Sequence, residues 1–371
     1  VPVGSYTCAA AHYPFCAATF DAVNKTFTHT WGDAYCSTDL AAYDFMFSTV
    51  YETPFVVDET TTVLPIALTF RPLMARIGMK LALGANETPK YVTFTTDDNV
   101  LPTAGTVNAD GTFSASALTN SLTVETDRKE FTVGLLPVGV ASKMSVHVTT
   151  TDGMTYSDKS FQLAGLKRNT HYTMNVPCRT KRFMLTVPDG VNSKYGTGTY
   201  GDNGFFQVEP QYDPESIFDG WHFLRSEIKS DKDAADGDVL KNRNRIQLQA
   251  VSLGTNRAQN GAFVTPPIQC DGTKTVTVSF TAATNKLTVG SVQYRIGVTN
   301  NGADISENFL RSFDNIQSSL EGECPWKHSG SVSRTHTFTV TNGQRIMMKV
   351  YSSGGGTPCH LELADFTYTV E

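Results

Sequence analysis

The chain has 371 residues, of which 11% are aromatic and 18% are charged, and its formal net charge at pH 7 is −6. At roughly 100–200 residues per domain, this length predicts two domains. No stretch concentrates Lys and Arg as a phosphate-neutralising surface would, which argues against nucleic acid as a partner. No run reaches the about 18 apolar residues of a membrane span, and the first residues contain neither a signal sequence nor a lipidated cysteine, so we expect that an export signal preceded Val1.

Seven cysteines cannot all pair within one chain. None lies in a C-x-x-C pair with a matching pair of histidines, which argues against a zinc site. We expect some buried thiols and one or two disulfides, and such bridges would imply an oxidising or extracytoplasmic compartment. The expected bridges fall within the groups Cys8, Cys16, Cys36 and Cys270, Cys324, Cys359.

The first 60 residues are irregular but rich in aromatic side chains, which bury large areas, so we expect this segment to pack onto a sheet. The stretch from 68 to 83, LTFRPLMARIGMKLAL, has apolar residues at every second position from Leu73 to Leu83, which predicts a strand with one buried face. Upstream, from Leu64 to Phe70, the apolar residues lie at even positions. Because a proline cannot donate to a strand ladder, the change of face at Arg71-Pro72 predicts a bulge or bend.

Further strands are predicted over 90–96, 129–138, 143–161 and 170–176 by the same alternation, with a hairpin turn at Asp152-Gly153. The basic stretch VPCRTKR, residues 176–182, ends this set of strands. A charge cluster at such a junction is typical of a solvated linker, so we place the domain boundary there and predict domains over 1–178 and 181–371.

Beyond the junction, a new set of about eight alternating strands extends to the end of the chain, with a turn at Asn342-Gly343. That number of strands over about 190 residues fits a jelly-roll sandwich better than a small immunoglobulin-type domain. Segments with a period of 3.6 residues are scarce. The sequence therefore predicts an all-β protein of two β-sandwich domains.

Catalytic signatures are missing. Nucleophilic hydrolysis would require an activated Ser or Cys with a base, and neither G-x-S-x-G nor a matching cysteine motif occurs. Glycoside hydrolysis would require two facing carboxylates, and the acidic residues in YDPESIFDGWHFLRSE, residues 212–227, are too ordinary to assign. We therefore expect a protein that is not an enzyme and has no cofactor.

One acidic loop is a candidate calcium site. SDKDAADGD, residues 230–238, brings four carboxylates together with a glycine, the oxygen-ligand density that Ca²⁺ prefers. The spacing does not fit an EF-hand, since no glycine stands at the sixth position and the twelfth is Asn242. The two interpretations are a structural calcium site and a solvated acidic loop, and the candidate ligands are Asp231, Asp233, Asp236 and Asp238.

Two tryptophans of the second half are candidate sugar-binding residues. Trp221 precedes His222, and Trp326 precedes Lys327 and His328. A planar ring beside hydrogen-bonding side chains suits the apolar face of a sugar, but the same ring is equally suited to fill a core. Core packing is the favoured interpretation for Trp221, whereas Trp326 lies in a Pro-Gly-polar setting where burial is harder.

The first half resembles the fimbrillin-like family of Bacteroidales surface proteins, which includes pilus subunits and adhesins. The resemblance covers about 40–178 and rests on YDFMFST (43–49), LTFRPLMARIGMKLAL, FTVGLLPV (131–138), TTDGMTYS (150–157) and LAGLKRNTHYTMNV (163–176). It implies a transthyretin-like β-sandwich and export as a lipid-anchored protein of the outer membrane. It also implies a structural or adhesive role at the cell surface, joined to other pilus or surface subunits by strand addition.

The second half departs from a standard pilin. GAFVTPPIQCDGTKTVTVSF (261–280) and CHLELADFTYTV (359–370) resemble galactose-binding-type jelly rolls, which are familiar as carbohydrate-binding modules. We therefore expect a surface adhesin, or an accessory or tip subunit of a pilus, whose second domain presents a ligand surface for glycan. The alternative is a polysaccharide-binding accessory or hydrolase of a glycan-utilisation system.

Overall fold

The structure is a computed structural model of the chain. It describes residues 2–13, 18–32, 35–61, 63–108, 110–163, 165–187, 192–195, 205–207, 220–230, 240, 243–250, 260–285, 291–300, 302–325, 330–353 and 359–371.

The chain forms two compact units. Unit 1 comprises Val1–Leu83, Thr88–Thr150 and Tyr156–Arg179, and unit 2 comprises Gly84–Glu87, Thr151–Thr155 and Thr180–Glu371. The change between them at residues 179 and 180 lies inside the basic stretch at which the sequence places the domain boundary. Two short segments of the first half nevertheless belong to unit 2. That each half folds alone stays a prediction.

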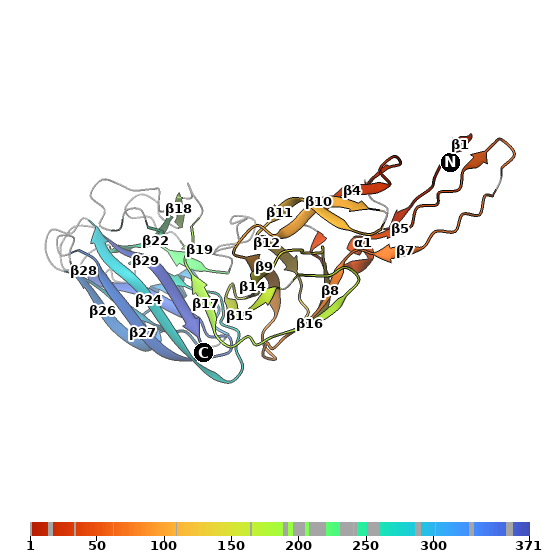
Figure 1. Ribbon diagram of the computed structural model, residues 1–371. Helices are drawn as coiled ribbons and strands as arrows, with labels where there is room; N and C mark the ends of the chain where they lie inside the picture. The colour runs from red at the N-terminus through yellow and green to blue at the C-terminus, as the bar shows by residue number, and fades with distance from the viewer. Residues whose placement is uncertain are drawn as a thin grey trace. The chain divides into compact units, whose positions relative to one another are not determined.

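Unit 1 has its core between two sheets (Figure 1). One has the order β12 (Ser121–Glu125), β9 (Pro89–Thr96), β14 (Ser142–Thr150), β15 (Thr155–Leu163), and the other the order β13 (Glu130–Leu135), β8 (Ala75–Leu81), β16 (His171–Val176). Strand β8 runs antiparallel to β13 and parallel to β16. Alternate residues of β8, starting at Ala75, are buried, and so are alternate residues of β14, so each strand turns one face to the core.

The predicted strand over 68–83 is two strands in two sheets. Strand β7 (Phe70–Pro72) pairs with β5 (Met46–Ser48), and β8 begins at Ala75 in the sandwich. Leu73 and Met74 between them are buried. The change of apolar face at Pro72 therefore marks a transfer between sheets and not a bend within one strand.

A four-stranded sheet and several short elements complete unit 1. The sheet has the order β11 (Phe113–Thr119), β10 (Leu101–Asn108), β4 (Thr26–Thr30), β3 (Thr19–Asp21). Helix α1 (Leu40–Tyr43) is a single turn, capped by Asp39, whose side chain accepts a hydrogen bond from the backbone of Ala42. The remaining strands are β2 (His12–Tyr13), which pairs with β5, and β1 (Gly4–Tyr6), which pairs with β6 (Phe55–Val57).

Unit 2 is a second sandwich of two sheets. The first sheet has the order β17 (Lys181–Met184), β29 (Cys359–Val370), β22 (Arg245–Ala250), β21 (Ser226–Lys229), β18 (Asn192–Tyr195), and β29 also pairs with β24 (Thr273–Asn285), which pairs with β27 (Val332–Thr341). The second has the order β19 (Phe205–Gln207), β20 (His222–Leu224), β23 (Ala262–Val264), β28 (Ile346–Ser353), β25 (Ser291–Val298), β26 (Gln317–Pro325). Helix α2 (Glu307–Arg311) is capped by Ser306. The predicted all-β fold of two sandwiches is confirmed.

The basic stretch at the junction is not simply a solvated linker. Lys181 is 1% exposed, and its Nζ lies 2.6 Å from Asp152 Oδ2 and 3.0 Å from Glu87 Oε1. Asp152 belongs to the predicted hairpin turn, where Gly153 has φ +77° and β14 and β15 are joined by four residues. Sequence alone could not show that the turn carboxylate and the junction lysine, both in unit 2, form a buried ion pair.

The expected disulfides are not all formed. The thiols of Cys8, Cys36 and Cys270 are free, so Cys8 and Cys36 are not bridged to each other. Burial raises the pKa of Cys36 to about 12, which keeps this thiol protonated and unreactive. In the part of the chain that the structure describes, no helix is long and apolar enough to cross a membrane.

Candidate functional site

The N-terminal residues of unit 1 form a narrow two-stranded arm with the segment around residue 50. Three register pairs join β1 to β6, from Gly4 with Val57 to Tyr6 with Phe55. Ala9 and Tyr51 then exchange two backbone hydrogen bonds of 2.9 and 2.8 Å. Closer to the sandwich, β2 pairs with β5. Figure 1 shows this arm extending beyond the other sheets of unit 1, with the N-terminus at its outer end.

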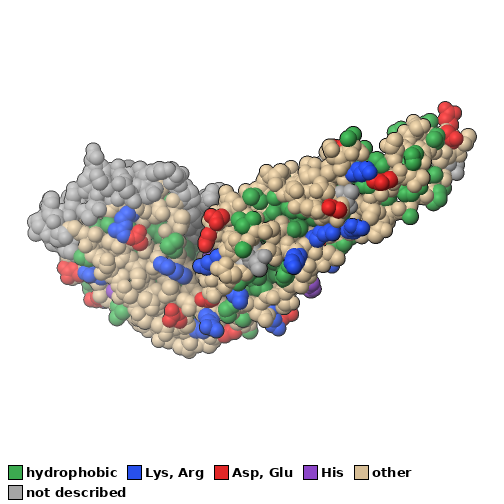
Figure 2. Space-filling view, viewed as in Figure 1, with side chains coloured by type: hydrophobic (Ala, Val, Ile, Leu, Met, Phe, Trp, Pro, Cys, Tyr) green, Lys and Arg blue, Asp and Glu red, His purple; other side chains and the backbone are tan. Residues whose placement is uncertain are grey.

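The arm has no buried core of its own. Every described residue in 2–13, 51–61 and 63–70 is exposed or half-buried, whereas core residues of the sandwich such as Val92 and Phe94 are fully buried. Apolar side chains nevertheless line its surface, and Figure 2 shows hydrophobic groups spread over it. Those most exposed are Val3 (63%), Tyr13 (45%), Val56 (60%), Val63 (81%), Leu64 (40%) and Phe70 (43%). An isolated two-stranded ribbon is marginally stable in water, so the arm is a surface that gains from being covered.

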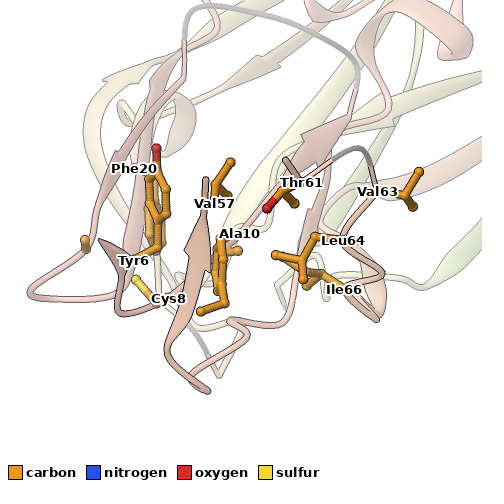
Figure 3. Close-up of a pocket in the computed structure, with 12 residues that line it drawn as sticks. Tyr6, Cys8, Ala10, Phe20, Val57, Thr61, Val63, Leu64 and Ile66 are labelled. Carbon is orange, nitrogen blue, oxygen red and sulfur yellow. The ribbon is translucent and has the colours of Figure 1, made fainter. Parts of the chain in front are cut away.

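An apolar groove of about 500 Å³ lies along the arm. Its walls come from the first ten residues, β3, β6 and the segment from 61 to 66. Figure 3 shows Leu64 and Ile66 on one side, Tyr6 and Cys8 on the other, and Val57 and Ala10 between them. The rings of Tyr6 and Phe55 stack with centroids 5.2 Å apart. The lining is mostly apolar, and its side-chain hydroxyls are those of Tyr6 and Thr61.

Polar contacts hold the loop beside the groove. Asp58 accepts hydrogen bonds from the backbone of Thr60 and from the hydroxyls of Thr60 and Thr61, at 2.7 to 2.9 Å. These bonds favour the charged form, so they lower the pKa of the Asp58 carboxyl. Across the arm, Lys25 pairs with Glu52. The described lining of the groove contains no charged residue.

The arrangement suits an extended apolar segment of another chain. Within the described part of the chain, β1 and β6 pair only with each other. Each therefore has an outer edge with backbone groups available to a further strand, and the groove beside them offers apolar contacts.

Trp221 and His222, predicted as candidate sugar-binding residues, are in the core of unit 2. Trp221 is 1% exposed, and its ring packs against Phe183, Phe263 and Phe366 and stacks on Phe223 with centroids 5.8 Å apart. A ring enclosed by four aromatic side chains has no face for a sugar. The core interpretation of Trp221 is therefore correct, and its assignment to a glycan site is wrong.

His222 is 6% exposed and lies beside Trp221 at the start of β20. Burial, with a smaller contribution from the nearby charge of Arg345, lowers the pKa of His222 to about 4. The imidazole is neutral at pH 7 and belongs to the interior, so the glycan assignment of His222 is wrong as well.

The other predicted sites lie outside the described residues. These are the glycan candidates Trp326, Lys327 and His328 and the calcium candidates Asp231, Asp233, Asp236 and Asp238. Elsewhere, in the residues that are described, no three His, Cys, Asp or Glu side chains are grouped so that they could hold a metal ion.

Comparison with protein families decides the identity of the first half. The model of the fimbrillin-like family matches residues 3–189, about half of the chain. The chain belongs to the fimbrillin-like family. A search of curated proteins finds no match.

Among solved structures, this fimbrillin-like chain is similar to two candidate cell adhesion proteins. The one from Bacteroides uniformis is 17% identical, with a TM-score of 0.33, and the match covers 45% of this chain and 65% of that one. The one from Bacteroides ovatus is 22% identical, with a TM-score of 0.31, and the match covers 47% of this chain and 63% of that one. The chain thus spans somewhat less than two thirds of the length of each.

A third solved structure is a C-terminal carbohydrate-binding module of a marine laminarinase from Zobellia galactanivorans. It is 9% identical, with a TM-score of 0.23, and the match covers 49% of this chain and all of that module.

One feature of the fimbrillin-like chain had no signal in its sequence. Lys349 in β28 is fully buried, donates to the backbone oxygen of Asn260 at 3.0 Å and lies 5.2 Å above the ring of Phe313. Burial lowers the pKa of Lys349 to about 7, and the positive charges of Arg311 and Arg225 contribute to the same shift. In the sequence, Lys349 is one polar residue in the run IMMKV, and nothing there distinguishes it from a surface lysine.

Proposed function

We propose that this fimbrillin-like protein is a non-enzymatic adhesin of the cell surface, or an accessory or tip subunit of a pilus. Membership of the fimbrillin-like family supports an adhesin-like surface role. The observation that carries the proposal for this chain is the arm of unit 1, which combines open strand edges, exposed apolar side chains and an uncharged groove of about 500 Å³ without a core of its own.

In this proposal a strand of a neighbouring subunit adds to the arm. Main-chain hydrogen bonds along the open edge of β1 or β6 would supply the pairing, and alternate side chains of the incoming strand would enter the groove beside Leu64 and Ile66. Burial of the exposed valines and Leu64 would contribute about 1.5–3 kcal/mol for each side chain that is fully covered. The protein would be exported and lipid-anchored at the outer membrane.

Unit 2 is proposed to present a glycan surface at Trp326, with Lys327 and His328. Stacking on one ring with a few exposed hydrogen bonds would give dissociation constants on the order of 0.1–1 mM, because sugar hydroxyls are already well hydrated in water. A structural calcium ion at Asp231, Asp233, Asp236 and Asp238 is a further proposal, and it is tested by a shift of melting temperature between calcium and chelator.

The test of the glycan proposal is retention of the whole chain on a glycan array. We expect Trp326→Ala to abolish retention and to leave the melting temperature nearly unchanged. If Trp326→Ala melts the protein, the ring is part of the core. If the wild type is retained by no glycan on a broad array, adhesion must depend on protein partners.

The second candidate function is a polysaccharide-binding accessory, or a hydrolase, of a glycan-utilisation system. Genes for pilus anchors and assembly beside the gene of this chain would favour the adhesin, whereas genes for polysaccharide transporters and glycosidases would favour the alternative. Release of reducing sugar from polysaccharide by the purified chain would contradict a non-enzymatic role.

A further inference from the structure

Strand β27 (Val332–Thr341) forms an open edge of the first sheet of unit 2. Its ten residues pair with β24 without a register shift, and among the described strands it pairs with no other. The strand contains no proline, and its one charged residue is Arg334. Natural sheets commonly protect a long edge with charged side chains, proline or a bulge, and of these β27 carries only the one charge of Arg334.

The orientation of the backbone groups of β27 follows from the neighbouring strand. Thr275 of β24 exchanges hydrogen bonds of 3.1 and 3.0 Å with Glu371, so this odd-numbered residue points its N–H and C=O toward β29. Successive residues of a strand point their backbone groups to opposite sides. The even-numbered residues of β24 therefore bond to β27, and their partners in β27 are also even, as in the pair Val278 and His336.

It follows that the odd-numbered residues of β27 direct their N–H and C=O groups out of the sheet edge. They are all hydroxyl residues with exposed side chains: Ser333, Thr335, Thr337, Thr339 and Thr341. Thr341 is already bonded to Gln344, because its N–H donates to the side-chain oxygen at 2.8 Å and its C=O accepts from the backbone N–H at 3.1 Å. The backbone groups open to another strand are therefore those from Ser333 to Thr339. The even-numbered residues His336, Phe338 and Val340 are buried in the sandwich. Arg334 also lies at an even position, where its guanidinium donates to the backbone oxygen of Glu323 at 2.6 Å. The hydroxyl face is therefore free of charge along the whole strand.

We propose that β27 is a self-association edge, at which two copies of this chain pair their β27 strands antiparallel about a two-fold axis. We place the axis at Thr337, so that Thr337 faces itself and Thr335 faces Thr339. Each of these pairs has its backbone groups at the edge, so each can exchange both N–H···O bonds. On the other face, His336 meets Phe338 of the second copy.

The chemistry of this pairing already occurs inside unit 2. Strand β24 presents Thr275, Thr277 and Ser279 to β27 in the same alternation, and the hydroxyls of Ser279 and Thr335 lie 3.1 Å apart. A second β27 would place the same hydroxyl pairs on the opposite side of the strand. The partner is a copy of this chain because the edge is uncharged and its residue pattern is complementary to itself, with no like charges placed opposite each other.

The proposal is tested by charge exchange at the two-fold axis in the full-length chain. Thr337→Lys and Thr337→Glu each place like charges opposite each other in the homodimer, and Thr337 is exposed, so both variants should fold. The assay is sedimentation velocity at about 10–100 µM protein. We expect wild type to shift from monomer to dimer as the concentration rises. Each variant should raise the dissociation constant of the dimer at least about tenfold. An equimolar mixture of the two variants should restore the dimer, because the introduced lysine of one chain then faces the introduced glutamate of the other.

Thr275→Lys is the matched control, since Thr275 is exposed on the same face but lies in β24, away from the edge. It should dimerise as wild type does. A wild type that stays monomeric throughout this range would overturn the proposal. So would a dimer that persists in both charged variants, or a mixture that stays as monomeric as its components.

Discussion

Replacement of Lys349 by Met should stabilise unit 2 at neutral pH. The ordinary pKa of lysine is 10.5, and in the folded chain burial lowers it to about 7. At about 1.4 kcal/mol per pKa unit, this difference sets an upper bound of about 5 kcal/mol on the cost of burying the charged form. The substitution also removes the hydrogen bond from the amine to Asn260 O, which reduces the gain in stability by about 1 kcal/mol. Loss of the attraction to the Phe313 ring reduces the gain by about as much. We therefore expect a net gain of up to about 3 kcal/mol.

The sign of the pH dependence follows from the same two pKa values. Below pH 7 the lysine is charged in both states, so the full cost is present. Between pH 7 and 10.5 the unfolded chain binds the proton that the folded chain has released, so the free energy of unfolding of wild type rises with pH. The advantage of Lys349→Met should therefore shrink from about pH 7 to about pH 10.

The assay is urea unfolding of wild type and variant at several pH values between about 7 and about 10. Lys274→Met, at a half-buried lysine of the same unit, is the control and should give a difference that is small and flat with pH. A Lys349→Met variant that is less stable than wild type at neutral pH, or a stability difference that does not change with pH, would refute the reasoning.

Three other substitutions probe the core of unit 2 and the arm of unit 1. Trp221→Ala should cost about 3–5 kcal/mol, because it empties a site enclosed by four aromatic rings, and calorimetry should show unit 2 unfolding at a much lower temperature. The folded chain should lose stability as the pH falls from 6.5 toward 4, because His222 in the unfolded chain takes up a proton that the buried imidazole does not accept. His222→Gln should make the free energy of unfolding depend less on pH over that range than it does in wild type. Leu64→Asp should remove the chain from surface filaments of native cells without melting it, whereas Val23→Asp, 88% exposed and outside the groove, should leave incorporation intact.

Alternation of apolar residues was sufficient to predict the sandwich strands. In β8, β14 and β27 every second residue is apolar because one face of the strand is buried, and in the structure these residues do face the core. Alternation could not separate β7 from β8. The apolar residues change from even to odd positions in the same way whether one strand bends or the chain passes to another sheet. The separation depends on the pairing of β7 with β5, a long-range contact.

Function-bearing residues were harder to predict for a related reason. Trp221 and Trp326 have similar neighbours in the sequence, and only the packing of Phe183, Phe263 and Phe366 around Trp221 identifies it as a core residue.

The first 60 residues show the opposite case. Their aromatic side chains predict burial against a sheet, which holds for Phe45 and Phe47, yet Phe55 and Tyr6 lie in the arm, which has no core. Composition does not say whether an apolar surface is covered by its own chain or by another.

Assembly of this chain with other surface subunits is tested most directly by immunogold electron microscopy of native cells, with antibody against the chain. We expect gold particles on filaments at the cell surface, at their tips or along them, because the proposed function has the arm of unit 1 completed by another subunit. Label spread diffusely over the envelope and never on filaments would contradict assembly with pilus subunits, and label confined to the cell interior would contradict the surface role altogether.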